Sequence, residues 1–229
     1  DKRVKLLIPS MGELNAEMFA AAIRSLGYNC EALPPSNSEI IKLGKSVATG
    51  KECLPVIILA GALLNYLFKS NNKDERVALF NVQGAGNCRL GQYPVFLKQV
   101  INNLRLRNVA QATLMNEDGF AGFGPNFAKR GIQAIIIGDI LEDIRSAILT
   151  NAKSPTKGIE IFYQELKKLI LAMEKDPENI DDYLKEFATN IRTKIPAKRN
   201  IEDSKFIALL GEIYVRRDLF THRFLNERL

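Results

Sequence analysis

Short apolar runs alternate with longer amphipathic stretches along the first 150 residues of the chain. The runs are typical of buried β-strands, and they lie at residues 5–9, 29–33, 76–82 and 109–115. The stretches that follow them predict helices at residues 16–26, 38–47, 56–68, 92–106 and 127–150. Strands that alternate with helices in this way predict a parallel sheet with helices on both faces.

The rest of the chain first turns helical and then apolar again. Residues 156–175 and 180–193 predict two helices, residues 205–215 (KFIALLGEIYV) a fifth strand, and residues 219–228 a final helix. The expected fold is therefore α/β, a flavodoxin-like or Rossmann-like parallel sheet of about five strands with a helical insertion before the last strand. We expect an α/β domain over residues 1–150, the insertion at 151–200, and at 201–229 the last strand and helix, which complete the α/β domain.

Composition narrows the class of protein. Hydrophobic residues make up 46% and charged residues 25% of the 229 positions, which excludes a disordered or low-complexity chain. The longest apolar stretch, residues 56–64, is far shorter than the ~20 residues of a membrane span, and no signal-peptide pattern is present. Three cysteines, an odd number, do not indicate a disulfide framework. We therefore expect a protein of the reducing cytoplasm, without a membrane partner.

The charge balance is basic but dispersed. Thirty-two Lys and Arg against twenty-six Asp and Glu give a net charge of +6, compatible with nucleic acid, a membrane surface or an anionic small molecule as ligand. Basic and acidic residues are interleaved, as in Glu174-Lys175-Asp176, and no zinc-finger or RNA-recognition pattern occurs. We therefore do not expect the protein to bind nucleic acid. We expect it to bind an anionic ligand or an acidic partner instead.

Two cysteines occupy equivalent places. Cys53 and Cys88 each follow a loop and precede a predicted helix, and in a doubly wound sheet such loops gather where ligands bind, at the carboxyl ends of the strands. A helix N-terminus favours the thiolate, which is a good ligand for soft metal centres such as iron–sulfur clusters. The alternative is that both are ordinary core thiols. Cys30 lies inside the second predicted strand, where we expect either a core residue or a third ligand of the metal centre.

Other polar groups are expected at the same edge of the sheet. Arg89, Gln92 and Tyr93 follow Cys88 and offer a guanidinium, an amide and a phenol to an anion or an acyl carbonyl. Residues 116–118 (NED) and 211–218, which include Glu212, end two of the predicted strands, with a solvated turn as the alternative for each. The only histidine, His222, nearly excludes Ser-His-Asp, Cys-His and multi-His zinc sites.

Three motifs carry a resemblance to a known family. They are Gly50-Lys51-Glu52-Cys53-Leu54-Pro55, Gly86-Asn87-Cys88-Arg89-Leu90-Gly91-Gln92-Tyr93 and Gly211-Glu212-Ile213-Tyr214-Val215-Arg216, called below the first, second and third motif. The chain resembles the 2-hydroxyacyl-CoA dehydratase subunit superfamily, and within it the cysteine-containing region of the proteins called CoA-substrate-specific enzyme activase or CoA protein activase. In the second motif, Asn87 and Leu90 stand where that branch usually has proline and phenylalanine.

The resemblance implies an oxygen-sensitive iron–sulfur protein of anaerobic metabolism. Members of the family have flavodoxin-like lobes that hold a cubane cluster through three cysteines, and an ATP-hydrolysing activator supplies one electron at low potential. In dehydratases the electron forms a ketyl radical from a 2-hydroxyacyl-CoA. Carried over to this chain, the resemblance implies that Cys53 and Cys88 would hold the cluster, of the 4Fe-4S type, and that Gly86, Arg89 and Gln92 would shape the pocket. Tyr93 and Glu212 are further candidates for substrate binding.

The sequence also departs from the family. Only two cysteines lie in the motifs, so a third ligand would be Cys30, an oxygen ligand or water, or a residue of another part of the protein. Because the glycine-rich ATPase signatures are absent, the activator would be a separate protein or a fused domain. We expect a homo- or heterodimer that passes electrons to a CoA thioester or another small substrate, and whether the chain is itself a dehydratase or reductase component stays open. The alternatives are a non-catalytic cluster carrier or interaction domain, and a metal-free domain that binds an anion at residues 84–89.

Overall fold

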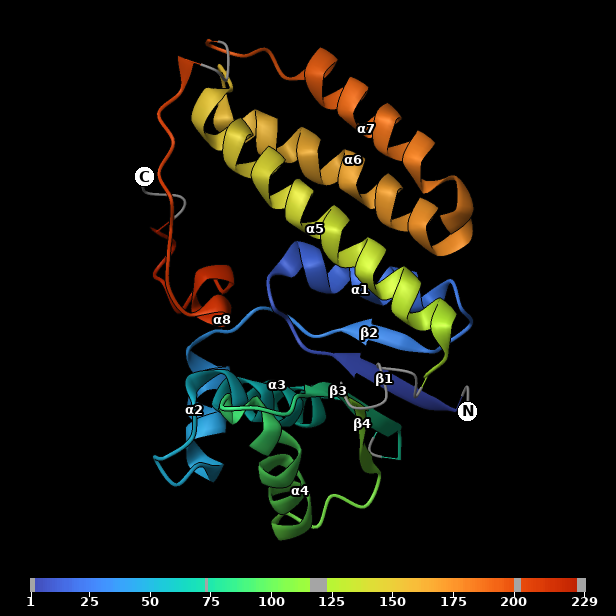
Figure 1. Cartoon of the computed structure of the whole chain (residues 1–229), viewed down its shortest axis with the longest axis vertical. Helices are drawn as coiled ribbons and strands as arrows, with labels where there is room; N and C mark the ends of the chain where they lie inside the picture. The colour runs from blue at the N-terminus through green and yellow to red at the C-terminus, as the bar shows by residue number, and fades with distance from the viewer. Residues whose placement is uncertain (1–2, 73, 116–122, 200–202, 226–229) are drawn as a thin grey trace.

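The computed structural model describes residues 3–72, 74–115, 123–199 and 203–225. A parallel sheet of four strands lies between two layers of helices (Figure 1). The strands are β1 (Val4–Ile8), β2 (Cys30–Ala32), β3 (Arg76–Gln83) and β4 (Val109–Met115), in the spatial order β2-β1-β3-β4. This order confirms the predicted α/β class and places a topological switch point between β1 and β3, where doubly wound sheets bind ligands.

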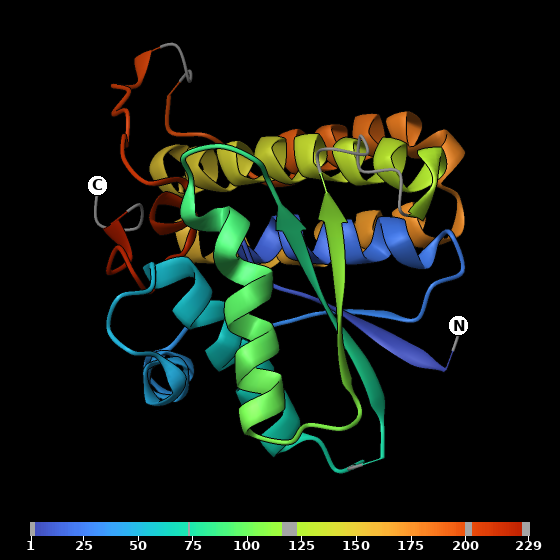
Figure 2. The ribbon, with the colours of Figure 1, turned by 60° about the horizontal axis from the view of Figure 1, so that its bottom comes forward.

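One face of the sheet is covered by α2 (Ser38–Val47), α3 (Leu54–Lys69) and α4 (Tyr93–Asn103), which share a core with it. Figure 2 shows α4 lying alongside β3 and β4. α2 and α3 cross very closely, because glycine occupies the crossing on both helices. A Cβ atom at Gly61 would lie 1.9 Å from the carbonyl oxygen of Ile40, and one at Gly44 equally close to that of Ile57. Neither position can therefore accept a side chain without moving a backbone.

The other face is covered by α1 (Glu13–Arg24) and by α5 (Pro125–Asn151), a helix of 27 residues. Glycines again set the distance, because a Cβ at Gly131 or Gly138 of α5 would come within 2.8 Å of Phe19 or Asn15 of α1. α6 (Pro155–Lys175) and α7 (Ile180–Lys194) form a further layer on these two helices. The hydrophobic core continues from the sheet through α1 into this layer, where the rings of Phe162 and Phe187 lie 5.8 Å apart.

The prediction of a fifth strand is wrong. Of the residues that the structure describes, 205–212 form no strand, and the side chains of Phe206 and Leu210 are 82% and 85% exposed. The chain then forms the short helix α8 (Ile213–Arg217), and turns replace the expected final helix over residues 219–224. α5 to α7 consequently follow the last strand instead of preceding one. A buried strand is apolar on both faces, so an apolar run such as residues 205–215 predicts a strand. The run itself does not show that the chain passes outside the sheet at these residues.

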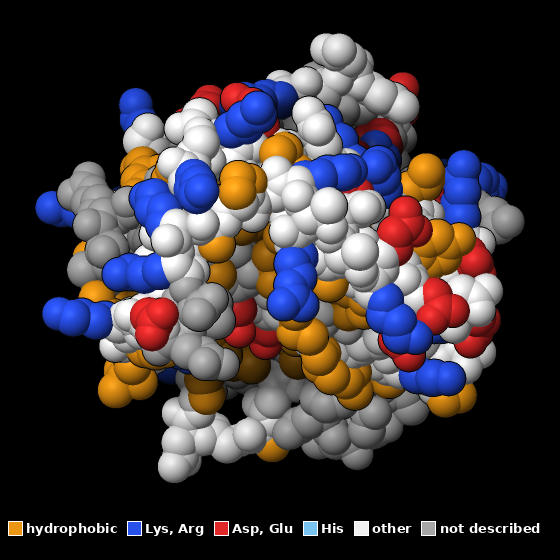
Figure 3. All heavy atoms as spheres, turned by 90° about the horizontal axis from the view of Figure 1, so that it is seen from above, with side chains coloured by type: hydrophobic (Ala, Val, Ile, Leu, Met, Phe, Trp, Pro, Cys, Tyr) orange, Lys and Arg blue, Asp and Glu red, His pale blue; other side chains and the backbone are white. Residues whose placement is uncertain are grey.

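Charged groups are distributed over the surface. On the face that Figure 3 shows, Lys and Arg side chains are spread out, with acidic and apolar side chains between them. None of the helices in the described part of the chain has both the length and the hydropathy needed to cross a membrane.

Candidate functional site

The three motifs meet at the carboxyl edge of the sheet. β3 ends at Gln83 and leads directly into the second motif, while α3 runs back toward β3 and therefore begins at the same edge with the first motif. α8, which contains most of the third motif, lies beside this edge (Figure 1). Segments separated by more than 100 residues in the sequence are thus brought together next to the switch point between β1 and β3.

The first motif forms a loop organised by its own carboxylate. The backbone N–H groups of Thr49, Gly50 and Lys51 donate to Glu52 Oε2 at 3.0 to 3.1 Å, and the Thr49 hydroxyl donates to Oε1 at 2.9 Å. Desolvation alone would raise the pKa of Glu52, but these hydrogen bonds lower it below its ordinary value. Gly50 has φ +90°, a conformation that favours glycine. The loop holds Cys53 half-buried at the N-cap of α3.

The second motif exposes its cysteine. Cys88 is the N-cap of the short 3-10 helix η1 (Arg89–Gln92), and its Sγ accepts the N–H of Leu90 at 3.5 Å. Nη1 of Arg89 donates to the carbonyl oxygen of Lys51 at 2.9 Å, which joins the second motif to the first. Gly86 has φ +118°, and both Gly86 and the side chain of Gln92 are exposed. The side chains of Arg89 and Gln92 are therefore exposed on the side of the loop that an anion could approach.

Tyr93, the first residue of α4, is half-buried near all three motifs. The Cys53 and Cys88 thiols and the Glu212 carboxylate lie near enough to its hydroxyl to affect the pKa of the phenol. Burial raises the pKa of Tyr93 above its ordinary value, and the neighbouring Cys53 raises it further.

The third motif closes this side of the site. Glu212 caps α8 by accepting the N–H of Val215 at 2.8 Å. Tyr214 is buried against α3 and α4, and its pKa is raised by burial and then by Asp218, with Glu212 and Tyr93 as further contributors. Tyr214 is a site residue that the sequence analysis did not single out, although it lies within the third motif.

Hydrogen bonds to one carboxylate and one ion pair, both made by residues directly after the third motif, hold it in place. Asp218 is buried and accepts the hydroxyl and the N–H of Ser36, at 2.6 and 3.2 Å, from the loop between β2 and α2. Arg217 donates to Asp139 of α5 at 2.6 Å. Sequence analysis placed residues 211–218 at this edge as the end of a strand. The location at the edge agrees with the structure, whereas the strand does not.

Cys30 is not brought to this site. It begins β2 and pairs with Leu6, which puts it level with Ala78 of β3, about 16 Å along the strand from Gln83. Its side chain lies in the core on the α1 face, whereas Cys53 begins a helix of the opposite face. Burial raises the pKa of the Cys30 thiol to about 12. Residues 116–118, which the sequence also predicted at this edge of the sheet, lie outside the described residues.

The donors gathered here fit part of a metal site. Two thiols lie near Tyr93, and one of them belongs to the N-cap residue of a helix of 16 residues. Over residues 3–72, 74–115, 123–199 and 203–225, no three His, Cys, Asp or Glu side chains are grouped so as to hold a metal ion. A cluster bound by Cys53 and Cys88 would therefore need its other ligands from outside the described residues or from small molecules.

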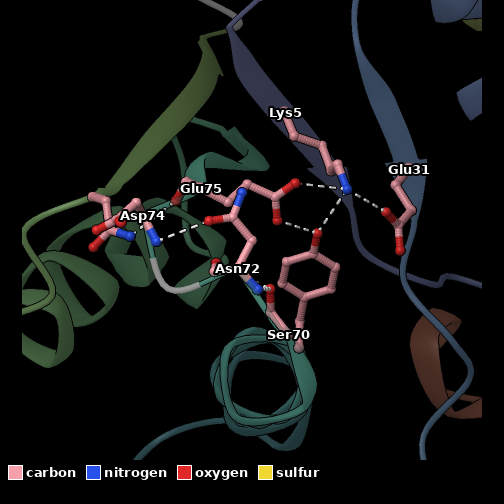
Figure 4. A network of polar contacts seen from close by, with 8 residues as sticks. Lys5, Glu31, Ser70, Asn72, Asp74 and Glu75 are labelled. Carbon is pink, nitrogen blue, oxygen red and sulfur yellow. Dashed lines mark hydrogen bonds and ion pairs between the residues drawn. The ribbon is translucent and has the colours of Figure 1, made fainter.

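A second polar cluster lies at the opposite end of the sheet (Figure 4). Nζ of Lys5 donates to Glu31 at 2.9 Å, to Glu75 at 2.8 Å and to the hydroxyl of Tyr66 at 2.9 Å, and that hydroxyl donates to Glu75 at 2.7 Å. Desolvation would lower the pKa of Lys5, but its hydrogen bonds to Glu75, Tyr66 and Glu31 raise it overall. All the charges are paired within the cluster, which indicates a structural role.

Comparison of the chain with family models, with curated proteins and with solved structures gave no match. The case for a function thus depends on the three motifs and on the geometry described above.

Proposed function

We propose that this chain binds an iron–sulfur cluster and takes part in ATP-driven, low-potential electron transfer, like the proteins of the 2-hydroxyacyl-CoA dehydratase and CoA activase family. The observation that carries the proposal is the hydrogen bond from Arg89 to the Lys51 carbonyl, which joins the two cysteine loops at the carboxyl edge of the sheet. Loops at this edge of a doubly wound sheet are where ligands bind, and the third motif lies beside them. We place the protein in the cytoplasm, where thiolate ligands stay reduced.

Each residue has a distinct task in this proposal. Cys53 and Cys88 bind the cluster as thiolates, and a 4Fe-4S cluster would supply the one-electron chemistry. Tyr93 lies near both thiols and would help to position the Cys53 side chain toward the cluster. Arg89 fixes the two cysteine loops relative to each other through the Lys51 carbonyl.

The substrate would bind on the exposed side of the second motif. Arg89 and Gln92 are exposed beside Cys88 and can donate to an anion such as the phosphates of a CoA thioester, while Glu212 of the third motif lies near Tyr93. The electron would come from an ATP-hydrolysing activator, as a separate protein or a fused domain.

Anaerobic reconstitution with iron and sulfide tests the cluster directly. We expect about four irons per chain or per dimer, with acid-labile sulfide and visible absorption. Cys53→Ala and Cys88→Ala should each lose this iron, whereas the matched control Cys30→Ala should retain it because Cys30 lies apart from the site. A colourless wild-type protein, or equal iron in all variants, would refute the proposal.

A metal-free, anion-binding domain is the second candidate. The observation that favours it is the number of thiols, because the described part of the chain brings only two of them together. This second candidate predicts that the reconstituted protein stays free of iron and that CoA or pyrophosphate still binds. Arg89→Gln should then weaken that binding. Titration calorimetry on the same preparations separates the two candidates.

A further inference from the structure

The outward face of α5 is apolar where a surface helix is usually polar. Ile132, Ile136 and Ile140 follow one another at intervals of four residues and are 60%, 54% and 46% exposed. Gly131 and Gly138 lie on the opposite side of the helix, where they contact α1. The glycine contacts thus fix the rotation of α5, and the isoleucines form a stripe that faces away from the molecule.

The stripe and its flanking charges are symmetric about Ile136. Ile132 and Ile140 stand four residues on either side, and the exposed Lys129 and Asp143 stand seven residues on either side. All five positions share one face of the helix, because seven residues make about two turns. Lys129 at one end of the stripe is therefore matched by the oppositely charged Asp143 at the same distance from Ile136.

We propose that a second copy of this chain packs on α5, with the two α5 helices antiparallel and a two-fold axis at Ile136. In this arrangement, Ile132 contacts the partner's Ile140, and Lys129 pairs with the partner's Asp143. Both contacts occur twice, as an isologous interface requires. The contact runs about 21 Å along the helix, and its antiparallel helices pack by ordinary ridges and grooves. The surface lies apart from the cysteines, so the pairing does not depend on cluster binding.

Sedimentation velocity measures the pairing in the absence of iron. At about 100 µM, a concentration suited to a small interface, we expect a species of about 51 kDa, twice the 25.6 kDa of the chain. Ile136→Asp should restore the monomer, whereas Leu171→Asp, at an equally exposed apolar position of α6, should leave the dimer intact. A monomeric wild-type chain would overturn the proposal and leave the stripe to a different protein. A dimer that survives Ile136→Asp would overturn it as well.

Charge reversal tests the antiparallel register. Lys129→Asp and Asp143→Lys should each weaken the dimer at least tenfold, because like charges then face each other, and the double variant should recover it. Cys substitution locates the axis in a background that lacks Cys53 and Cys88. Ile136→Cys should form a disulfide-linked dimer on oxidation, whereas Ile132→Cys should not, because its neighbour is the partner's Ile140. Failure of the double variant to recover, or cross-linking at Ile132 alone, would refute this register.

Discussion

The carboxylate of Glu165 should contribute a measurable part of the stability of the helical layer. Only 5% of its side chain is exposed, and it accepts hydrogen bonds from Lys168 of the same helix and from Lys194 and Asn190 of α7, at 2.7 to 3.1 Å. The side chain of Glu165 thus joins α6 to α7. The hydrogen bond from Lys194 is the main reason that the pKa of Glu165 falls from 4.5 to about 2.

The size of the effect follows from this difference in pKa. A fall from 4.5 to about 2 corresponds to about 3.4 kcal/mol in favour of the charged form in the folded state. Lys168 and Lys194 are 64% and 45% exposed, and solvent screens both of them. We therefore expect Glu165→Gln to lower the free energy of unfolding at pH 7 by about 2 kcal/mol, or the Tm by about 4–8 °C.

Urea unfolding at a series of pH values provides the assay. Because the folded-state pKa is lowered, the contribution of Glu165 is complete above about pH 5 and disappears as the pH falls toward 2. Wild type and Glu165→Gln should therefore differ at pH 7 and converge in acid. Glu160→Gln, an exposed position of the same helix, is the matched control and should differ little from wild type. A difference for Glu165→Gln that does not change with pH would refute the electrostatic explanation.

Two further substitutions test the packing and the anchoring of the site. Gly61→Ala should destabilise the chain by about 3 kcal/mol in urea unfolding, because the new methyl group would meet the carbonyl oxygen of Ile40 at 1.9 Å. Gly84→Ala is the control, since its Cβ would have no neighbour nearer than 3.9 Å, and an equal loss there would contradict the argument. Asp218→Asn should cost about 2 kcal/mol by weakening the bonds to Ser36, and limited proteolysis of residues 204–212 should become at least tenfold faster. An unchanged rate of cleavage would show that Asp218 does not anchor the segment.

Most of the sheet could be predicted because its signals are local. β4 has the predicted bounds. The parallel direction of the strands also follows from the chain, because strand–helix units that repeat along the sequence form parallel sheets. Their spatial order, β2-β1-β3-β4, does not follow from any local pattern. Helix ends were predicted less closely. The sequence predicts a helix from residue 16, whereas α1 begins at Glu13 with Gly12 as its N-cap, and Asn15 donates to Asp139 from inside the helix.

The site could be predicted only in part. The motifs identify Cys53 and Cys88, and a helix after each of them indicates the edge of the sheet on which they lie. The position of Cys30 depends on the pairing of β2 with β1, which no local pattern encodes. The position of Tyr93 near Cys53 likewise depends on how α4 packs against α3. The return of residues 211–218 to the site depends on the buried bond between Asp218 and Ser36, which are 182 residues apart.

This long-range anchoring makes the third motif a separate unit of local stability. The segment is attached through a few contacts, and the residues before it bury little, since Phe206 and Leu210 are exposed. Detaching it needs only a fraction of the free energy of global unfolding. In a hydrogen-exchange experiment, the amides of α8 should therefore exchange through a sub-global opening that leaves β1 and β3 protected. Such an opening exposes the buried Tyr214 and frees space beside Tyr93 without loss of the sheet, and it gives a bulky group a way in and out of the folded protein.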